Sequence, residues 1–567
     1  MKRCPQCRRD YYDETLLYCL DDGTHLLDGP ASANEPATAI LNSVPPRSEA
    51  QTQTIDPADI TSPPNAETAV FRSPAAARKP IRTAWLIGGV ALVIAALGYA
   101  GYRSYLSNIG KEINSVAVLP FENTSGDPNM DYLSDGISET VIDKLSQLPQ
   151  LKVIARASSF KYRGPNVDLQ DVANKLGVQA VVMGKVGKKG EQLSVRVEMV
   201  DVRTNSQLWG QQYNPRHGTV TLEQDIAQQV ARELRVKLTG QQEQQIAKSG
   251  TNNPRAHELL LKGRYFSQRP GTEAKLKARD LFQQAIDADP NYAPAYANLS
   301  ISYSRLAILN LMGPKEAMPM AEANARKALE LDDSLPESHM ALARFFQYRW
   351  QWKEAESEFQ KAVELNPNLP MALFGYADLL SIMGRYDEAL PLVQRVRSLD
   401  PLTLPILTQL SSVHFNGRRY DEALAAARER SELEPSSDTA QTYAGYALLA
   451  KGQYREAIAS FEKSVDLGNT GTSNRIFLGV AYAGAGDREK AETILSTLRN
   501  GKEHYSPCEL AILLGALGSK DDALASLEKA YTIHDAQMQY LKVDPAFDPL
   551  RDDLRFADLL RRVGLTE

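Results

Sequence analysis

The sequence predicts a multidomain protein whose C-terminal half is an all-α solenoid of stacked helix pairs. The chain has 567 residues, more than a single hydrophobic core usually organises. In the C-terminal half, small residues recur every 34 residues, a period typical of two-helix repeats. Before the repeats, strand and helix signals alternate over a normal domain length, which favours an α/β domain. We expect, in chain order, a small metal-type module, one transmembrane helix, this α/β domain and the solenoid.

Composition limits the classes of function. The formal net charge is −6, which gives the whole chain no attraction to nucleic acid. Only four cysteines occur, and three of them lie within the first twenty residues. This crowding favours a local metal site in a reducing compartment over a disulfide framework. The fourth, Cys508, stands alone, and we expect it to be a small buried hydrophobic residue on a helix.

Residues 1–27 carry cysteines at the spacing of two metal knuckles. The pattern Cys4-x2-Cys7-x11-Cys19-x2-Asp22 resembles a short zinc ribbon. The predicted ligands of one structural zinc ion are Cys4, Cys7, Cys19 and Asp22. A ribbon would have Cys at the fourth position, so Asp21 and His25 are alternatives to Asp22, and a knuckle that folds without metal is the other interpretation. A module this short cannot build a core, so bound metal would supply its folding energy.

The same module has a basic face, formed by Lys2, Arg3, Arg8 and Arg9. Such a face could contact nucleic acid or anionic lipid. The alternative is a solvated face close to the membrane, which needs no partner. Nucleic acid is therefore a partner only through this module.

Residues 28–83 are rich in Pro, Ala, Ser, Thr and Asn and lack a hydrophobic period, which indicates a disordered linker. The following segment, residues 84–102, contains no charge and is long enough to cross a bilayer, where about 20 residues are needed. Trp85 lies at one end and Tyr99 and Tyr102 at the other, as in an aromatic belt. We therefore expect a transmembrane helix, with a buried soluble helix as the alternative.

The charges beside this segment predict its orientation. Cations before it are Arg72, Arg78, Lys79 and Arg82, and cations after it are Arg103 and Lys111. The excess lies on the N-terminal side, which should then be cytoplasmic. We expect a single-pass protein of the cytoplasmic membrane whose C-terminal domains are periplasmic or otherwise extracytoplasmic.

Residues 111–240 predict the α/β domain. Strands are expected at 115–121, 151–155, 180–186, 193–202 and 207–213, and helices at 134–148, 169–176 and 221–238. Several stretches, including SVAVLPFENTSGDP, LKVIARASSFKY and RVEMVDVRTNSQLW, resemble the TolB amino-terminal-like (FlgO-like) domain. That resemblance implies an α/β domain just outside a bacterial membrane, with an envelope sensory or assembly role and no catalytic residues.

From residue 254 to 535 the chain keeps three positions in a 34-residue phase. Small residues recur at Ala321, Ala355, Ala389, Ala423, Ala457 and Ala491. The turn between repeats holds Asp333, Pro367, Pro401, Pro435 and Asn469, and a tyrosine recurs at Tyr386, Tyr420 and Tyr454. The pattern is similar to that of the tetratricopeptide-repeat family and predicts about eight units, the second lengthened near residues 308–319. Residues 536–567 resemble the closing segment of such arrays, and we expect them to cap the exposed apolar end.

These features predict a binding protein rather than an enzyme. We find no phosphate-binding loop, nucleophile elbow, kinase signature or metalloprotease motif, and we expect no catalytic residues. Stacked repeats form a groove that binds protein or peptide. From the repeat phase, the expected partner-binding residues of the groove are Arg305, Arg344, Tyr348, Asp378, Gln409 and Gln441. The alternative is a transmembrane signalling or transcriptional regulator whose cytoplasmic module acts on nucleic acid or on the transcription machinery.

Overall fold

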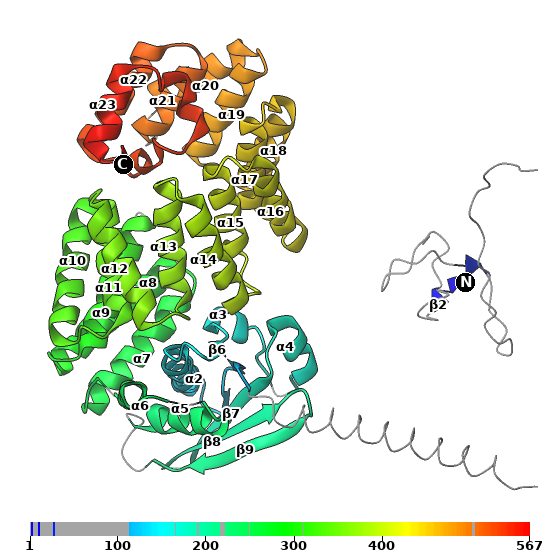
Figure 1. The fold of residues 1–567 in the computed structure, drawn as a ribbon, viewed down its shortest axis with the longest axis vertical. Helices are drawn as coiled ribbons and strands as arrows, with labels where there is room; N and C mark the ends of the chain where they lie inside the picture. The colour runs from blue at the N-terminus through cyan, green and yellow to red at the C-terminus, as the bar shows by residue number, and fades with distance from the viewer. Residues whose placement is uncertain are drawn as a thin grey trace, which may run out of the picture. The chain divides into compact units, whose positions relative to one another are not determined.

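The computed structural model describes residues 113–566 except 165, 190–191, 216–220, 237, 249, 310 and 502–504, together with three short N-terminal strands (Figure 1). The chain divides into two units, Met1–Ala95 and Ala96–Glu567. In the first unit, β1 (Lys2–Arg3) pairs antiparallel with β2 (Asp10–Tyr11) and with β3 (Leu27–Asp28). The predicted zinc ligands, linker and transmembrane segment lie outside the described residues. Among the helices that are described, none is long and apolar enough to span a bilayer.

The second unit begins with an α/β domain built on a mixed six-stranded sheet. Its strands are β4 (Ser115–Val118), β5 (Glu122–Asn123), β6 (Lys152–Val153), β7 (Ala180–Lys189), β8 (Gln192–Asp201) and β9 (Ser206–Tyr213). The strand order is β6-β4-β7-β8-β9, with β5 pairing beside β7. Strand β4 runs parallel to β6 and β7, whereas β7, β8 and β9 form antiparallel hairpins. The predicted α/β region is therefore confirmed.

Helices cover both faces of this sheet, because alternate residues of a strand point to opposite sides. Val116 and Val118 face a core shared with α2 (Asp131–Ser146) and α5 (Leu222–Glu233). Ala117 and Leu119 face a second core under α4 (Leu169–Leu176). A short helix, α3 (Arg156–Ser159), follows β6.

The helix predicted over residues 221–238 is wrong at its C-terminal end. Helix α5 stops at Glu233, and Arg235 then takes a positive φ of 56°, which an α-helix cannot accommodate. A separate helix, α6 (Gly240–Ala247), follows. Thr239 starts it with a capping box, in which its side chain accepts from the Gln242 amide and the Gln242 side chain accepts from the Thr239 amide. The predicted segment therefore holds a single helix that ends at Glu233, and α6 lies beyond it with its own capping box.

From residue 254 to 533 the described chain forms eight helix pairs, each with a first helix (A) and a second helix (B). The first four pairs are α7 (Pro254–Gln268) with α8 (Thr272–Ala288), α9 (Ala293–Ile308) with α10 (Pro314–Leu331), α11 (Pro336–Tyr348) with α12 (Trp352–Leu365), and α13 (Pro370–Ile382) with α14 (Tyr386–Leu399). The last four are α15 (Pro405–Asn416) with α16 (Tyr420–Leu433), α17 (Asp438–Ala450) with α18 (Tyr454–Asp466), α19 (Thr472–Gly484) with α20 (Arg488–Asn500), and α21 (Pro507–Ala516) with α22 (Lys520–Ile533).

The small residues in 34-residue phase lie where helices cross most closely. All six are at most 1% exposed: Ala321, Ala355, Ala389, Ala423, Ala457 and Ala491. Large rings fill the neighbouring space, and Phe359 and Phe461 are both fully buried. Each ring lies against a helix glycine, because an added Cβ would come within 2.5 Å of Phe359 at Gly375 and within 2.6 Å of Phe461 at Gly445. The all-helical solenoid predicted from the sequence is confirmed.

Successive A helices contact one another from α11 through α13, α15, α17 and α19 to α21. They therefore line one continuous surface, which we call the A-helix face. Position in the repeat thus determines which side chains reach a common surface.

The C-terminal residues do more than cap the array end. After α22 the chain forms two 3-10 helices, η2 (Ala536–Tyr540) and η3 (Pro545–Leu550), and then α23 (Leu554–Val563). We call residues 534–566 the closing segment. It reaches back to the third repeat. The Trp352 indole N–H donates to the Val563 carbonyl at 2.8 Å, and the Trp350 ring stacks on His534 at 3.7 Å between ring centroids. The segment packs against α21 and α22 at the end of the array and also joins this eighth repeat to the third.

The α/β domain is bound tightly to the repeats through one buried amide. Asn368, in the turn after α12, is 2% exposed. Its Nδ2 donates to the carbonyl oxygens of Ser146, Leu148 and Leu151 at 3.0, 3.1 and 2.9 Å. Ser146 is the last residue of α2, where a carbonyl has no helical donor, and Leu148 and Leu151 lie in the following loop. The Leu148 carbonyl also accepts from the Leu151 amide at 3.1 Å. One repeat turn therefore completes the hydrogen bonding of a loop in the other domain.

Two further contacts extend this interface. The Ala155 amide donates to the Leu399 carbonyl at 2.8 Å, which links the start of α3 to the end of α14. Arg264 on α7 donates to the Asp143 carboxylate on α2 at 2.8 Å. Burial raises the pKa of Asp143 to about 6, although the Arg264 cation opposes that rise. The α/β domain and the first four repeats therefore share a polar, buried interface.

Candidate functional site: a cavity on the A-helix face

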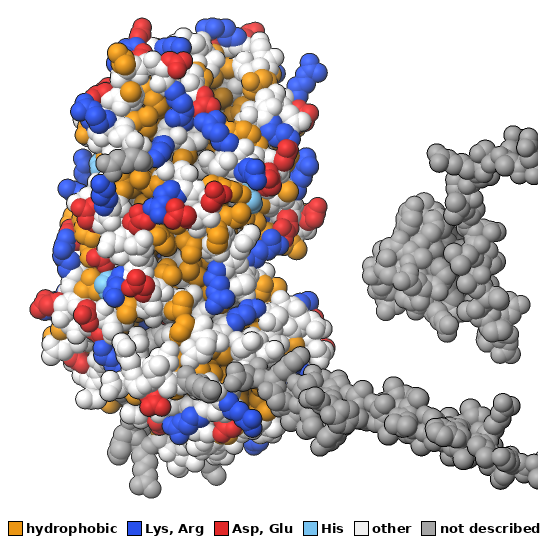
Figure 2. Space-filling view, viewed as in Figure 1, with side chains coloured by type: hydrophobic (Ala, Val, Ile, Leu, Met, Phe, Trp, Pro, Cys, Tyr) orange, Lys and Arg blue, Asp and Glu red, His pale blue; other side chains and the backbone are white. Residues whose placement is uncertain are grey.

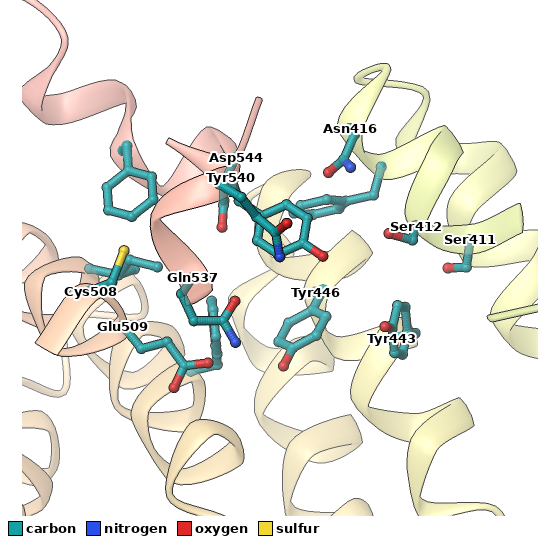
Figure 3. A pocket seen from close by; sticks show the side chains of 15 residues that line it. Ser411, Ser412, Asn416, Tyr443, Tyr446, Cys508, Glu509, Gln537, Tyr540 and Asp544 are labelled. Atoms are coloured by element: carbon teal, nitrogen blue, oxygen red, sulfur yellow. The ribbon is translucent and has the colours of Figure 1, made fainter. Parts of the chain in front are cut away.

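A cavity of 260 Å³ lies between the A-helix face and the closing segment (Figure 3). Helices α15, α17, α19 and α21 form one wall, and residues 537–547 form the other. The lining residues are Ser411, Ser412, Phe415, Asn416, Tyr443, Tyr446, Phe477, Cys508, Glu509, Ile512, Gln537, Gln539, Tyr540, Asp544 and Phe547. Residues more than a hundred positions apart in the chain therefore meet at one site.

Aromatic rings form much of this cavity. The Tyr446 ring lies 4.6 Å from Phe477 and 5.6 Å from Tyr443 between ring centroids, both in T-shaped geometry. Phe415 lies 6.4 Å from Tyr446 on the other side. Tyr540 belongs to the closing segment, and Figure 3 shows its side chain on the same cavity as Tyr446. Edge-to-face packing holds these rings in fixed orientations.

The tyrosine hydroxyls supply polar groups at the cavity wall. Tyr443, Tyr446 and Tyr540 are each half-buried. Among the described residues, none forms a hydrogen bond with the hydroxyl of Tyr443, Tyr446 or Tyr540. Burial raises the pKa of Tyr446 and Tyr540 well above the usual tyrosine value, so both hydroxyls stay protonated. They can therefore act as donors or acceptors toward a bound group.

Two carboxylates complete the site. Glu509 is 7% exposed and accepts from the Ser473 hydroxyl at 2.8 and 2.6 Å. Burial raises the pKa of Glu509 to about 7, with Asp535 and Asp544 adding to the rise and the Ser473 hydrogen bond opposing it. Burial likewise raises the pKa of Asp544 to about 6, while the Ala546 amide, donating at 2.8 Å, lowers it. Both groups are negatively charged for part of the neutral pH range, without a cation in the cavity wall.

Cys508 lies beside Glu509 and is 1% exposed. Burial raises the pKa of its thiol well above the usual value, so the thiolate needed for nucleophilic attack is scarce. The prediction that Cys508 is a buried hydrophobic residue on a helix is confirmed, since it is a free, buried cysteine in α21.

Three of the predicted groove residues lie together on α11 and α13. Arg344 donates to the Asp378 carboxylate at 3.4 Å. Gln347, which the repeat phase does not single out, donates to Asp378 at 3.1 Å and to Gln539 of the closing segment at 3.2 Å. Only the folded chain shows that the closing segment reaches this cluster, since nothing in the local sequence around Gln539 indicates α11 as its partner.

Tyr348 also contacts the closing segment. Its backbone carbonyl accepts from His534 Nε2 at 2.6 Å, and the two rings lie 5.3 Å apart. The sequence predicted an open groove at these residues, whereas the structure places the protein's own C-terminal residues against Tyr348 and against the Arg344 cluster.

The remaining three groove predictions lie elsewhere. Gln409 is 4% exposed and donates to the Phe374 carbonyl at 2.6 Å, so it is a packing residue between repeats rather than an exposed groove residue. Gln441 donates to Ser431 of α16, a B helix, at 3.0 Å. Arg305 donates to the Ser267 carbonyl at 3.0 Å, and burial lowers its pKa. Phase alone cannot separate a side chain that faces the groove from one that bonds the neighbouring repeat.

The charged surface is mixed on the face shown in Figure 2, where Lys and Arg side chains alternate with Asp and Glu side chains. No group of three or more His, Cys, Asp or Glu side chains is placed to hold a metal ion within the described part of the chain. The cavity brings together aromatic rings, tyrosine hydroxyls and two carboxylates from distant parts of the described chain.

Family models match three parts of the chain. Residues 358–390 and 408–472 match tetratricopeptide-repeat models, so the C-terminal region consists of tetratricopeptide repeats. Residues 112–233 match the model described as the second domain of HilA/YgeH-like transcriptional regulators. The resemblance of the same region to the TolB amino-terminal-like domain stays a prediction.

A curated relative is the "Putative adenylate cyclase 3" of Rhizobium meliloti, 34% identical over 231 residues. The match covers 40% of this chain and 39% of that protein, so less than half of the relative is represented here.

Solved structures with a similar fold have low sequence identity. A tetratricopeptide-repeat protein from Parabacteroides merdae is 14% identical with a TM-score of 0.36, covering 47% of this chain and 98% of its own. Yeast Tom70 is 18% identical with a TM-score of 0.35, covering 55% of this chain and 68% of its own. PilF of Pseudomonas aeruginosa is 21% identical with a TM-score of 0.30, covering 36% of this chain and 90% of its own.

Proposed function

We propose that this protein is a membrane-anchored, non-catalytic scaffold or sensor that binds other proteins through its tetratricopeptide repeats. The observation that carries the proposal is the continuous A-helix face, formed by six successive A helices from α11 to α21. A stacked array of this kind offers a broad surface whose shape is set by packing, which suits binding more than catalysis.

Site-specific photo-crosslinking in cells tests this proposal. A crosslinking amino acid at Tyr443, on the cavity side of α17, should capture a discrete partner. The control is the same crosslinking amino acid placed at Glu489, which is exposed at the start of α20. Capture at Tyr443 alone supports binding at the A-helix face. Absence of any crosslinked protein at Tyr443, with the chain expressed and folded, contradicts it.

Membrane anchoring is part of the same proposal. It is supported by the uncharged segment at residues 84–102 and by the larger number of cations before that segment than after it. We propose a cytoplasmic N-terminus and extracytoplasmic C-terminal domains. C-terminal fusions to alkaline phosphatase and to a cytosol-only fluorescent protein test this topology. Phosphatase activity is the expected result, and fluorescence of the cytosolic reporter would show that the C-terminal domains are cytoplasmic instead.

We also propose that residues 1–27 bind one structural zinc ion through Cys4, Cys7, Cys19 and Asp22. The proposal is supported by the knuckle spacing of the three cysteines and by the thiolate preference of zinc. Metal analysis of the purified full chain should give one zinc per chain, and a Cys4→Ser/Cys7→Ser double variant should lose it. The single Asp22→Ala variant, compared with His25→Ala, identifies the fourth ligand.

A second candidate is a signalling or transcriptional regulator. It is favoured by the match of residues 112–233 to a domain of HilA/YgeH-like transcriptional regulators and by the basic N-terminal module. Deleting residues 1–27 should then abolish a transcriptional response, and an unchanged transcriptome would exclude this candidate. The name of the curated relative adds one direct check of the non-catalytic proposal, since cyclic AMP formation by the purified full chain would contradict it.

A further inference from the structure

We propose that the cavity on the A-helix face binds a small organic cation, an ammonium or guanidinium group carried on a short aliphatic chain. This inference rests on the proposed function only where the cation is a lysine or arginine side chain of a partner protein. A free amine of the same chemistry would use the same groups.

The charge of the lining selects a cation. Glu509 and Asp544 both face the cavity, whereas no lysine or arginine occurs among its fifteen described lining residues. An anion placed here would lie beside the buried Glu509 carboxylate and the half-buried Asp544 carboxylate, which is costly in a poorly solvated site. The cations nearest to Asp544 are Arg418 and Arg551, which are outside the cavity lining and are paired with Asp548. A bound cation would instead pair with the two carboxylates and favour their charged form.

The aromatic rings select an organic cation. The rings of Phe415, Tyr443, Tyr446 and Phe477 line the space from the repeats, and Tyr540 lines it from the closing segment. Aromatic rings attract cations through their negative faces and also cover apolar carbon atoms. A fully hydrated inorganic ion would gain little from such walls, whereas an alkyl ammonium or guanidinium would use both properties.

Hydrogen-bonding capacity points in the same direction. The hydroxyls of Tyr443, Tyr446 and Tyr540 have no hydrogen-bond partner among the described residues. The side chain of Gln537 points into the same space in Figure 3. Hydroxyl and amide oxygens can accept from the several N–H groups of a guanidinium or ammonium. The 260 Å³ volume, close to the lower limit of ligand pockets, suits a ligand of few heavy atoms.

The closing segment gives the site a second property. Gln537, Tyr540 and Asp544 belong to this segment, and Tyr446 and Glu509 belong to the repeats. A bound cation would therefore contact both the closing segment and the repeats, and it should stabilise the packing of the segment against the A-helix face.

Titration calorimetry on the detergent-solubilised full chain tests the inference. The probes are agmatine, which carries a guanidinium and an ammonium, an acetylated and amidated Gly-Arg-Gly tripeptide, and glutarate as an anion of similar length. Saturable binding of agmatine or the tripeptide, without binding of glutarate, is the expected result. No binding of either cation, or equal binding of glutarate, overturns the inference.

Matched variants locate the binding site. Glu509→Gln keeps the shape and the Ser473 contact but removes the charge, and it should weaken agmatine binding by about tenfold or more. Tyr446→Leu should weaken binding to a similar extent by removing the ring, whereas Tyr446→Phe keeps the ring and should retain most of the affinity. Glu489→Gln on α20 removes an exposed charge away from the cavity and should change nothing. Circular dichroism of each variant shows whether it has folded, and wild-type affinity in folded Glu509→Gln overturns the inference.

The binding experiments distinguish a cationic side chain of a partner protein from a free amine. Binding of the tripeptide but not of agmatine assigns the cation to a partner's arginine. Binding of agmatine together with failure of the Tyr443 photo-crosslinking experiment retains the cation site and removes the proposed protein partner.

Discussion

Replacing Asn368 with alanine should loosen the contact between the α/β domain and the repeats. One buried amide group, with two N–H hydrogens, lies within 3.1 Å of three carbonyl oxygens at the end of α2 and in the following loop. No water can replace it easily, because Asn368 is 2% exposed. Alanine removes this donor from all three carbonyls, of which the Leu148 carbonyl still accepts from the Leu151 amide.

The expected cost follows from the hydrogen-bond count. An intramolecular hydrogen bond makes a net contribution of about 1 kcal/mol to stability, and a buried acceptor left without a partner costs about 1–3 kcal/mol. Two lost donors therefore correspond to roughly 2–4 kcal/mol for separation of the two modules. Since about 1.4 kcal/mol is a factor of ten, separation should become on the order of a hundredfold more frequent.

Hydrogen exchange measures this separation directly. The Ala155 amide donates to Leu399 across the same interface, so its exchange rate reports interface opening. We expect a large acceleration in Asn368→Ala. Asn368→Asp, which keeps the shape but offers no donor to the carbonyls, should behave similarly. Asn324→Ala removes an amide that donates only to the Met320 carbonyl of its own helix and serves as the control. An Ala155 rate within threefold of wild type in Asn368→Ala, or an equal change in the control, would refute the argument.

Three further substitutions test the repeats, the cavity and the closing segment. Gly445→Ala should lower the free energy of unfolding by about 1–3 kcal/mol in chemical denaturation, because an added Cβ would lie 2.6 Å from Phe461. The control is Gly515→Ala, whose added Cβ would have its nearest contact at 4.0 Å and which should be neutral or stabilising. Equal effects of the two substitutions would contradict the packing around Phe461. The pKa of Glu509 is raised from 4.5 to about 7, so the native state binds a proton that the unfolded chain has lost, and stability should fall as pH rises between these values. Glu509→Gln should remove a dependence on the order of 3 kcal/mol at most, seen as a smaller difference in melting temperature between pH 5 and pH 8, and an unchanged difference would exclude Glu509 as its source. Trp352→Phe removes the indole hydrogen bond to α23 and should lower the free energy of α23 docking by about 1 kcal/mol. Hydrogen exchange of the α23 amides should become faster, and the α16 amides serve as the control.

The elements with strong local signals could be predicted from the sequence. The 34-residue phase of Ala355 and Ala457 follows from close helix crossing, and both residues are fully buried. The helix at residues 169–176 ends at Gly177, which takes the left-handed φ of 62° expected of a helix-ending glycine. Helix α23 covers residues 554–563 and buries Phe556, Leu559 and Val563 on one face, a spacing that is itself a local property of the sequence. In each case the deciding interactions lie within a few residues or repeat at a fixed period.

The cavity could not be predicted from the repeat phase, because none of the six predicted groove residues lines it. The phase did place Arg344 and Asp378 at equivalent positions of successive repeats, and these two residues interact. The same phase misplaced Gln409, because a polar side chain that bonds a neighbouring carbonyl has the same sequence signal as one that faces a groove. Glu509 lies in no motif, and the resemblance of residues 536–567 to a closing segment did not indicate that Tyr540 lines a cavity, since each residue acquires its role from a distant partner.

The sequence by itself determined that this protein has an α/β region followed by a tetratricopeptide-repeat solenoid, because alternation, period and capping are local properties of the chain. Only the tertiary structure decided that the closing segment returns to the third repeat, that Asn368 holds the α/β domain, and that aromatic rings and carboxylates enclose a cavity. The physical reason is range: these contacts join residues such as Trp352 and Val563, 211 positions apart, and no periodic pattern links them. Their partners are selected by the shape of the stacked array, which exists only once the chain has folded.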